Sequence, residues 1–273
     1  MNKSIVFLVL LILISSLEFS KMYGQNSPLS EDGFETIFNG KNWDGWHLKI
    51  RNGSDKQAHE VFSIENNMVH VYKYQVDSFD INTRRCATHG LFYTNKMYSK
   101  YVLRFEYKWG EKIANNFDQW QYDAGCYFHV LDDDVWPKGV EYQIRYDHIK
   151  DRNHTGDLIL SGVKAQWYCD ENTQFCLPKD GGVPNTPKGW MFLAEDDVEY
   201  NALNGKWNQC EIIVMADKYA IYKLNGKVVN LLSNISVNEG IIGLQAETAE
   251  IFYRNIQIKE FDEIIPMEIF LED

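Results

Sequence analysis

The sequence has few of the features that mark several large classes of protein. Its 27 Lys and Arg residues are outnumbered by 39 Asp and Glu residues, which gives a formal net charge of −12. A chain this acidic has no general attraction to a phosphate backbone or to an anionic membrane surface, so we expect neither as a partner. Its 45% hydrophobic and 24% charged residues are ordinary for a globular protein, and this balance excludes collagen-like, coiled-coil and disordered chains.

Motifs of several enzyme and metal-binding classes are also missing. The five cysteines contain no CxxC pair, and the seven histidines form neither HxH nor HExxH. Zinc ribbons, thioredoxin-like centres and zinc proteases are therefore not indicated. Without a GxSxG or a Walker sequence, the common serine hydrolases and P-loop nucleotide binders are not indicated either. The sequence demands no cofactor, and only a divalent metal ion that assists catalysis is left open.

Long apolar runs are absent except near the start of the chain. Lys3 precedes ten consecutive apolar residues at 5–14, and small residues follow up to Gly24. Ten apolar residues are too few to cross a bilayer, whereas this arrangement is typical of a secretory signal peptide. We predict a signal peptide over residues 1–24 and one mature domain over residues 25–273, secreted or periplasmic, with no membrane span.

An exported chain can form disulfides, and two of the five cysteines lie close together in a polar stretch. Cys169 and Cys176 are the pair that we expect to be able to bond. Because the number of cysteines is odd, at least one is left free or pairs between chains, and the full pairing stays open.

Short runs of alternating apolar and polar residues recur along the mature chain, whereas helical periodicity is hard to find. This pattern predicts antiparallel strands. The predicted strands are 34–38, 61–64, 68–72, 101–109, 125–131, 140–146, 208–215, 219–224, 227–232, 241–246 and 251–259. Residues 147–200 are rich in Asp, Asn, Gly and Pro and are expected to form long loops. The sequence thus predicts one all-β, antiparallel sandwich over about 30–261, followed by an acidic tail.

Three predicted strands carry polar side chains at alternate positions, which places those side chains on one face of each strand. The set consists of Glu106 and Lys108, then Asp123, Tyr127 and His129, and then Glu141, Gln143 and Arg145. A solvated sheet face is the ordinary explanation of such a pattern. The mixture of Tyr, His, Gln and Arg with carboxylates instead favours a carbohydrate site. Four tryptophans in neighbouring loops either stack on a sugar ring or plug the ends of the sandwich: Trp120, Trp136, Trp167 and Trp190.

Segments along nearly the whole mature chain resemble, in order, the 3-keto-disaccharide hydrolase domain family. They are FETIFNGKNWDGW (34–46), YVLRFEYKW (101–109), DAGCYFHV (123–130), GVEYQI (139–144), GKWNQCEIIV (205–214), YKLNGKVVN (222–230) and GIIGLQAETAEIFYRNIQIKEF (240–261). The chain departs from the family's usual Ser-Gly at Ala124-Gly125, and it has Glu247 where members often have His. Glu247 and Arg254 fit a structural ion pair near the closing strands equally well, and for Arg254 we favour that structural role.

The resemblance implies a concanavalin A-like jelly roll and, for some members, cleavage of glycosides already oxidised to a ketone at carbon 3. The ketone acidifies the hydrogen on carbon 2, so that a base and an enolate stabiliser suffice for elimination, and water then adds. Glu141 or His129 is the expected base, and Arg145 or Lys108 the expected stabiliser. The residues expected to bind substrate are Asp123, Gln143, Glu106, Tyr127, Gln245, Trp120 and Trp190.

Two alternatives are left open by the sequence. One is a non-catalytic carbohydrate-binding module with the same fold, because fold does not determine function. The other is an ordinary glycosidase or a polysaccharide lyase. A glycosidase requires a second carboxyl group opposite Glu141, and residues 140–146 do not supply one, since Gln143 and Arg145 follow at the alternate positions.

Overall fold

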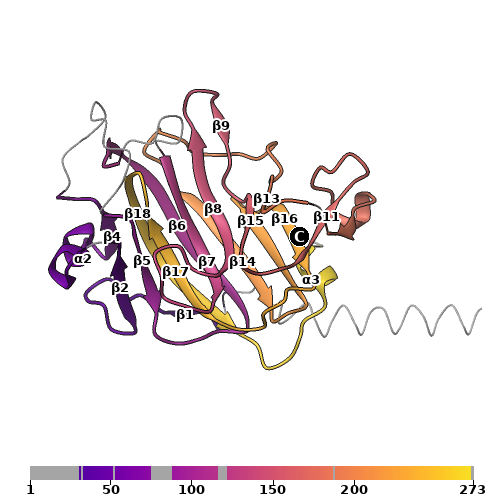
Figure 1. Cartoon of the computed structure of the whole chain (residues 1–273), viewed down its shortest axis with the longest axis horizontal. Coiled ribbons are helices and arrows are strands. Elements are labelled where there is room, and N and C mark those ends of the chain that lie inside the picture. The colour runs from indigo at the N-terminus through magenta and orange to yellow at the C-terminus, as the bar shows by residue number, and fades with distance from the viewer. Residues whose placement is uncertain are drawn as a thin grey trace, which may run out of the picture. The chain divides into compact units, whose positions relative to one another are not determined.

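The strands of the chain form two antiparallel sheets that pack face to face (Figure 1). The computed structural model describes residues 31, 33–51, 53–74, 88–115, 122–186 and 188–271. The predicted signal peptide lies outside these residues. Contacts separate the unit Glu35–Ile265, which contains every described strand, from a second unit that includes Pro266–Asp273. The second unit holds helix α3 (Met267–Leu271). No helix in the described ranges is long and apolar enough to cross a membrane.

The described strands are arranged in sheets of ten and eight. The larger sheet has the order β12 (Val183–Asn185), β11 (Gln166–Cys169), β16 (Lys227–Ser233), β15 (Tyr219–Leu224), β14 (Asn208–Met215), β6 (Lys100–Ile113), β18 (Ala249–Glu260), β4 (Met68–Val71) and β3 (Phe62–Glu65), with β1 (Glu35–Thr36) also on β18. The smaller sheet has the order β13 (Met191–Phe192), β10 (Leu158–Ser161), β8 (Gly139–Asp147), β7 (Tyr122–Val130), β17 (Ile241–Ala246), β5 (Gly90–Thr94) and β2 (Trp46–Ile50), with β9 (Arg152–Asn153) also on β8.

The all-β, antiparallel sandwich expected from the sequence is therefore confirmed. Strands β14, β15 and β17 begin and end at the predicted residues. The predicted hairpin of β3 and β4 turns at Asn66 and Asn67, whose φ angles of 49° and 60° suit a tight turn that matches the twist of the strands. Alternation predicts these strands because one face of each strand packs against the other sheet, whereas the opposite face points away from it.

Other elements were not expected from the sequence. Strands β2 and β5 were missed, and so were the short strands β9 to β13 within the stretch predicted as loops. The sequence also gave no sign of helix α2 (Asp55–Val61) or of the 3₁₀ turn Pro178–Asp180. Helix α2 is held by a capping box, in which Gln57 N donates to Ser54 Oγ and Ser54 N donates to Gln57 Oε1. Seven residues make only two turns, which is too short for helical periodicity to show.

The core between the sheets is rich in aromatic side chains. Val140, Tyr142 and Ile144 of β8 point into it, as their alternation predicts. Tyr142 packs against Tyr222 of β15 with ring centroids 5.0 Å apart and against Phe105 of β6 at 6.5 Å, so these contacts join the two sheets. Their inward orientation forces the intervening residues of β8 onto the outer face of the smaller sheet.

The bond that the sequence allows between Cys169 and Cys176 is absent, and both side chains are free thiols. Cys169 is buried at the end of β11. The thiol of Cys176 lies 3.5 Å from the carbonyl oxygen of Asp180 and 3.7 Å from that of Leu177. Closeness in sequence therefore did not give a disulfide. Cys86 lies outside the described residues.

Candidate active site

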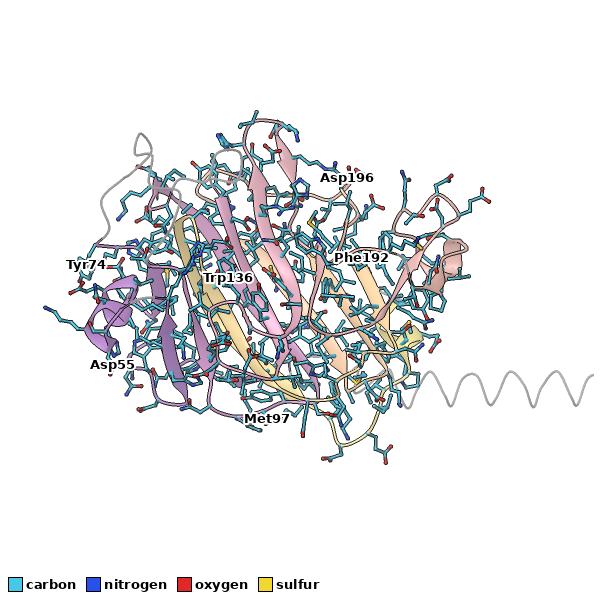
Figure 2. All side chains as sticks on the ribbon, in the orientation of Figure 1. Asp55, Tyr74, Met97, Trp136, Phe192 and Asp196 are labelled. Carbon is cyan, nitrogen blue, oxygen red and sulfur yellow. The ribbon has the colours of Figure 1, made fainter. Side chains whose placement is uncertain are left out.

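The outer face of the smaller sheet is hollowed by a cavity of about 530 Å³. Six of the predicted site residues line it: Asp123, Tyr127, Glu141, Gln143, Arg145 and Trp190. Trp136, Glu247 and the segment 159–162 complete the lining. Figure 2 labels Trp136, which projects over the strands that carry the polar residues. The cavity thus gathers three carboxyl groups, one guanidinium group and two indole rings.

The polar face of β8 is covered and not solvated. Glu141 is 3% exposed, and Gln143 and Arg145 are similarly buried. Polar side chains that are this deeply buried require partners, because burying an unpaired polar or charged group is costly. By contrast, Trp136 and Trp190 at the rim are 48% and 62% exposed. This combination of an apolar rim and a polar floor is typical of a binding site for a small polar ligand.

Glu141 lies across the neighbouring strand β7, directly above Gly125. A Cβ atom placed on Gly125 would come within 2.1 Å of Glu141 Oε1, so the absence of a side chain at Gly125 makes room for this carboxyl group. Burial raises the pKa of Glu141 to about 8, against the opposing effect of a hydrogen bond with Tyr127. A carboxyl group with this pKa is a stronger base than an exposed one when it is ionised.

Asp123, Gln143 and Arg145 form a linked group beside Glu141. Gln143 Nε2 donates to Asp123 Oδ1 at 2.5 Å and to the carbonyl oxygen of Ala124 at 2.8 Å. Burial raises the pKa of Asp123 to about 7, although the positive charge of Arg145 and the bond from Gln143 oppose this. The Arg145 guanidinium lies 3.5 Å from Asp157, which also pairs with His154 at 2.9 Å. The buried carboxylate of Asp157 therefore fixes the position of the Arg145 guanidinium.

Gln245 of β17 also faces this side of the sheet, as predicted. Leu244 pairs with Cys126, so Gln245 comes beside Gly125 in the next register position. The side chain is buried, and its Oε1 has no hydrogen-bond partner within the described part of the chain. A buried acceptor without a partner is suited to receive a hydroxyl group from a ligand.

Glu247 is a residue that the sequence left undecided between the site and a structural ion pair with Arg254. Its carboxyl group lines the cavity. Its Oε1 lies 3.8 Å from His89 Nε2, and His89 in turn packs edge-on against Trp136 at 4.8 Å. Arg254 instead pairs with Glu106 at 2.6 Å. The replacement of the family's usual His by Glu was the only signal in the sequence, and it pointed to position 247 without giving its orientation.

Glu106 and Lys108 were predicted to share the polar face, but they lie elsewhere. Both belong to β6, which sits in the larger sheet between β14 and β18. Lys108 lies 5.1 Å above the ring of Trp207 and 5.0 Å above that of Phe252, on the far side of the sandwich. The prediction failed because strands that are consecutive in sequence do not have to be neighbours in one sheet.

His129 was predicted to face the cavity, and the structure contradicts this as well. The β7–β17 register shifts between Ile241 and Gly243, and His129 takes a φ of 52° at this bulge. Its Nε2 lies 3.0 Å from the carbonyl oxygen of Ala216, toward the larger sheet. Val130 takes the outward position in its place, next to Tyr127. One extra residue in a strand reverses the alternation beyond it.

The tryptophans divide between the two predicted roles. Trp136 and Trp190 stand at the cavity, whereas Trp167 is buried and stacks on Phe192 with centroids 5.3 Å apart. Trp120 lies outside the described residues. Within the described ranges, no group of three or more His, Cys, Asp or Glu side chains is arranged to hold a metal ion.

The comparison with protein families agrees with this arrangement. Residues 33–259 match the family described as the 3-keto-alpha-glucoside-1,2-lyase-like domain. The chain belongs to this family. The match includes every described strand that contributes a side chain to the cavity. No curated protein matches the sequence.

Solved structures share the fold of this 3-keto-glucoside lyase-like domain at low identity. A provisionally assigned glycosyl hydrolase from Parabacteroides distasonis is 18% identical, with a TM-score of 0.51, and the match covers 85% of this chain and 95% of that one. A second such protein from the same organism is 19% identical, with a TM-score of 0.49 over 84% and 99%. Carbohydrate-binding module CBM66 from Bacillus subtilis is 11% identical, with a TM-score of 0.46 over 79% and 96%. The first of these supports the fold alone, and the family match supports a carbohydrate-active role.

Proposed function

We propose that this protein cleaves glycosides and disaccharides that carry a ketone at carbon 3, and that it does so outside the cytoplasm after removal of residues 1–24. The observation that carries the proposal is one strand, β8, which presents a buried acid, Glu141, and a buried cation, Arg145, to the same cavity. The exposed rings of Trp136 and Trp190 at the rim suit the apolar faces of a sugar. Export is checked by N-terminal sequencing of the secreted or periplasmic protein.

Glu141 is the base in this proposal. The ketone acidifies the hydrogen on carbon 2, and a carboxylate buried as deeply as Glu141 accepts that proton readily because water does not stabilise its charge. The pKa of Glu141 is about 8. We therefore expect kcat/KM to rise with pH up to about 8, as the base becomes ionised.

Arg145 stabilises the enolate oxygen that forms at carbon 3. A fixed cation aimed at the atom where negative charge develops is the standard means of lowering such a barrier. Asp157, at 3.5 Å, fixes the guanidinium, and Asp123 and Gln143 supply hydrogen bonds to ring hydroxyls. The enolate then expels the substituent on carbon 1, and water adds to the double bond. The family description, which names a 1,2-lyase, supports the elimination half of this sequence.

An ordinary glycosidase is a second candidate, because the cavity contains more than one carboxyl group. Asp123 and Glu247 accompany Glu141, and two carboxyl groups across a glycosidic bond are what such an enzyme requires. The two candidates differ in the substrate they accept. A glycosidase cleaves the unoxidised parent sugar, whereas the elimination needs the ketone.

The first experiment exposes the mature protein to a 3-keto disaccharide and to its unoxidised parent in heavy water, followed by proton NMR. We expect cleavage of the keto sugar alone, with deuterium entering at carbon 2. Cleavage of the parent would instead identify a glycosidase. Binding without turnover of either sugar would identify a carbohydrate-binding module. A parallel sample with a chelator tests whether a divalent metal ion assists.

The second experiment compares Glu141→Gln with Glu106→Gln. Loss of the base in Glu141→Gln should lower the rate at which the keto sugar is cleaved by about 100-fold or more, and it should abolish deuterium entry at carbon 2. Glu106→Gln removes a carboxylate from the outer face of the other sheet and should leave both unchanged. If Asp123→Asn abolishes deuterium entry and Glu141→Gln does not, Asp123 is the base.

A further inference from the structure

Glu247 lines the cavity but takes no part in the steps above. It directly follows β17, where Ala246 pairs with Gly90, so Glu247 comes beside His89. On its other side, Thr248 N donates to the carbonyl oxygen of Asp123 at 3.2 Å. Glu141 lies in register with Tyr127, which pairs with Gly243, four residues before Glu247. The Glu141 carboxyl group, however, reaches over Gly125, which lies beside Gln245, two residues before Glu247. It therefore comes within about 7 Å of Glu247 along the strand direction, at about 3.3 Å per residue.

The backbone of Glu247 is fixed by two side chains. Tyr72 Oη donates to the carbonyl oxygen of Glu247 at 3.0 Å, and Asn115 Nδ2 donates to the same oxygen at 2.6 Å. Neither bond uses the carboxyl group. These two bonds therefore hold the backbone of Glu247 in place, and its carboxyl group faces the cavity.

A structural ion pair does not account for this carboxyl group. The neighbour at 3.8 Å is His89, and burial together with the nearby charge of Arg51 lowers the pKa of His89 to about 4. His89 is therefore neutral at neutral pH and supplies no positive charge. The other charged groups that face Glu247 are Asp123, Glu141 and Arg145.

These surroundings favour the protonated form of the carboxyl group. Burial raises the pKa of Glu247 well above its ordinary value, and Asp123 and Glu141 add to the effect, while Arg145 opposes it. The cavity thus contains a proton donor at Glu247 and a base at Glu141. The base comes from β8 and the proton donor from the residue that follows β17.

We propose that Glu247 is the general acid that protonates the departing glycosidic oxygen. The inference rests on the proposed function. When the Glu141 carboxylate takes the proton from carbon 2, that C–H electron pair forms the enolate. The enolate pair then re-forms the ketone and the double bond between carbons 1 and 2, as the bond from carbon 1 to the leaving oxygen breaks. That oxygen keeps the bonding pair and takes the proton of Glu247, so the leaving group departs as a neutral alcohol.

The same two groups return to their starting states during hydration. The Glu247 carboxylate removes a proton from water as the water oxygen bonds to carbon 1, and the Glu141 carboxyl group returns its proton to carbon 2. The net reaction consumes one water and no other reactant. Glu247 is thereby a catalytic residue whose role matters most when the leaving group is a poor one.

The test compares two 3-keto glucosides, one with a p-nitrophenolate leaving group and one with methanol. Glu247→Gln should lower the rate of the methyl glucoside by about 100-fold and that of the p-nitrophenyl glucoside by less than about threefold, since p-nitrophenolate needs no proton to depart. Deuterium entry at carbon 2 should persist in Glu247→Gln, and Glu141→Gln should abolish it for both substrates. A thermal melt of each variant confirms that it is folded.

An equal loss with both leaving groups would overturn the assignment, because it would mean that Glu247 only binds or positions the sugar. Loss of deuterium entry in Glu247→Gln would overturn it too, by making Glu247 part of the proton abstraction. Failure of the proposed function looks different: the unmodified protein would then cleave neither keto glucoside and exchange no deuterium, and the role of Glu247 would fall with it.

Discussion

At the scale of single residues, the candidate site is built from carboxyl groups that the fold buries, although burial disfavours their charged form. Glu141, Asp123 and Glu247 all have a raised pKa, and burial is the largest cause for each. Perturbed carboxyl groups that converge in a cavity are typical of functional sites. The sequence predicted the direction of Glu141, Gln143 and Arg145, because strict alternation fixes it. It did not predict Glu247, because this residue follows the strand, where alternation no longer applies.

The raised pKa of Glu141 has a consequence for stability. The folded protein keeps this carboxyl group protonated up to about pH 8, whereas the unfolded chain ionises it near its ordinary value of 4.5. The free energy of unfolding is therefore not reduced by Glu141 below pH 4.5, and it falls as the pH rises from 4.5 to about 8. Glu141→Gln, which is always neutral, should be more stable than the unmodified protein at pH 9, by on the order of 1–3 kcal/mol.

Chemical denaturation at pH 5 and at pH 9 measures this difference. The gain should be larger at pH 9, and Glu106→Gln serves as the control because its carboxylate is paired with Arg254 on the other sheet. A gain of the same size at both values would show that Glu141 is not held neutral by burial.

At the scale of secondary-structure elements, β7 decides what the cavity can contain. Gly125 leaves the space that the Glu141 carboxyl group fills, and the bulge at His129 turns that ring toward Ala216. Both features come from one strand, and they act in opposite ways. The glycine admits a functional group, whereas the bulge removes one that the sequence pattern had placed at the site.

Gly125→Ala tests the role of this glycine. Its backbone is not in the left-handed region, so alanine is tolerated there, but the new methyl group would displace Glu141 Oε1, 2.1 Å away. We expect activity on the keto sugar to fall by at least about 10-fold while the free energy of unfolding changes by less than about 1 kcal/mol. Full activity in this variant would mean that the carboxyl group works from another position.

At the scale of the whole sandwich, burial between the sheets controls the chemistry of the cysteines. Cys126, Cys169 and Cys210 are fully buried, and burial raises the pKa of the Cys126 and Cys210 thiols well above the ordinary value. Cys176 is partly exposed. A buried thiol with a raised pKa reacts slowly because the thiolate is the reactive form.

Alkylation of the folded, unreduced protein checks this difference by peptide mass spectrometry. Of the four cysteines in the described ranges, Cys176 should be modified first, and Cys126 and Cys210 should react only in denaturant. Recovery of a peptide pair that links Cys169 to Cys176 would contradict the structure and show the disulfide that the sequence allows.

The sequence by itself determined the sandwich, the inward and outward faces of β8 and the family. These properties follow from local alternation and from motifs in order, which any pairing of the strands preserves. Only the tertiary structure decided which strands share a sheet, and it thereby separated Glu106 and Lys108 from Glu141. The structure also turned His129 away at a bulge and brought Glu247 to the cavity. The physical reason is that strand order and register depend on contacts between residues far apart in the chain, and no local pattern records them.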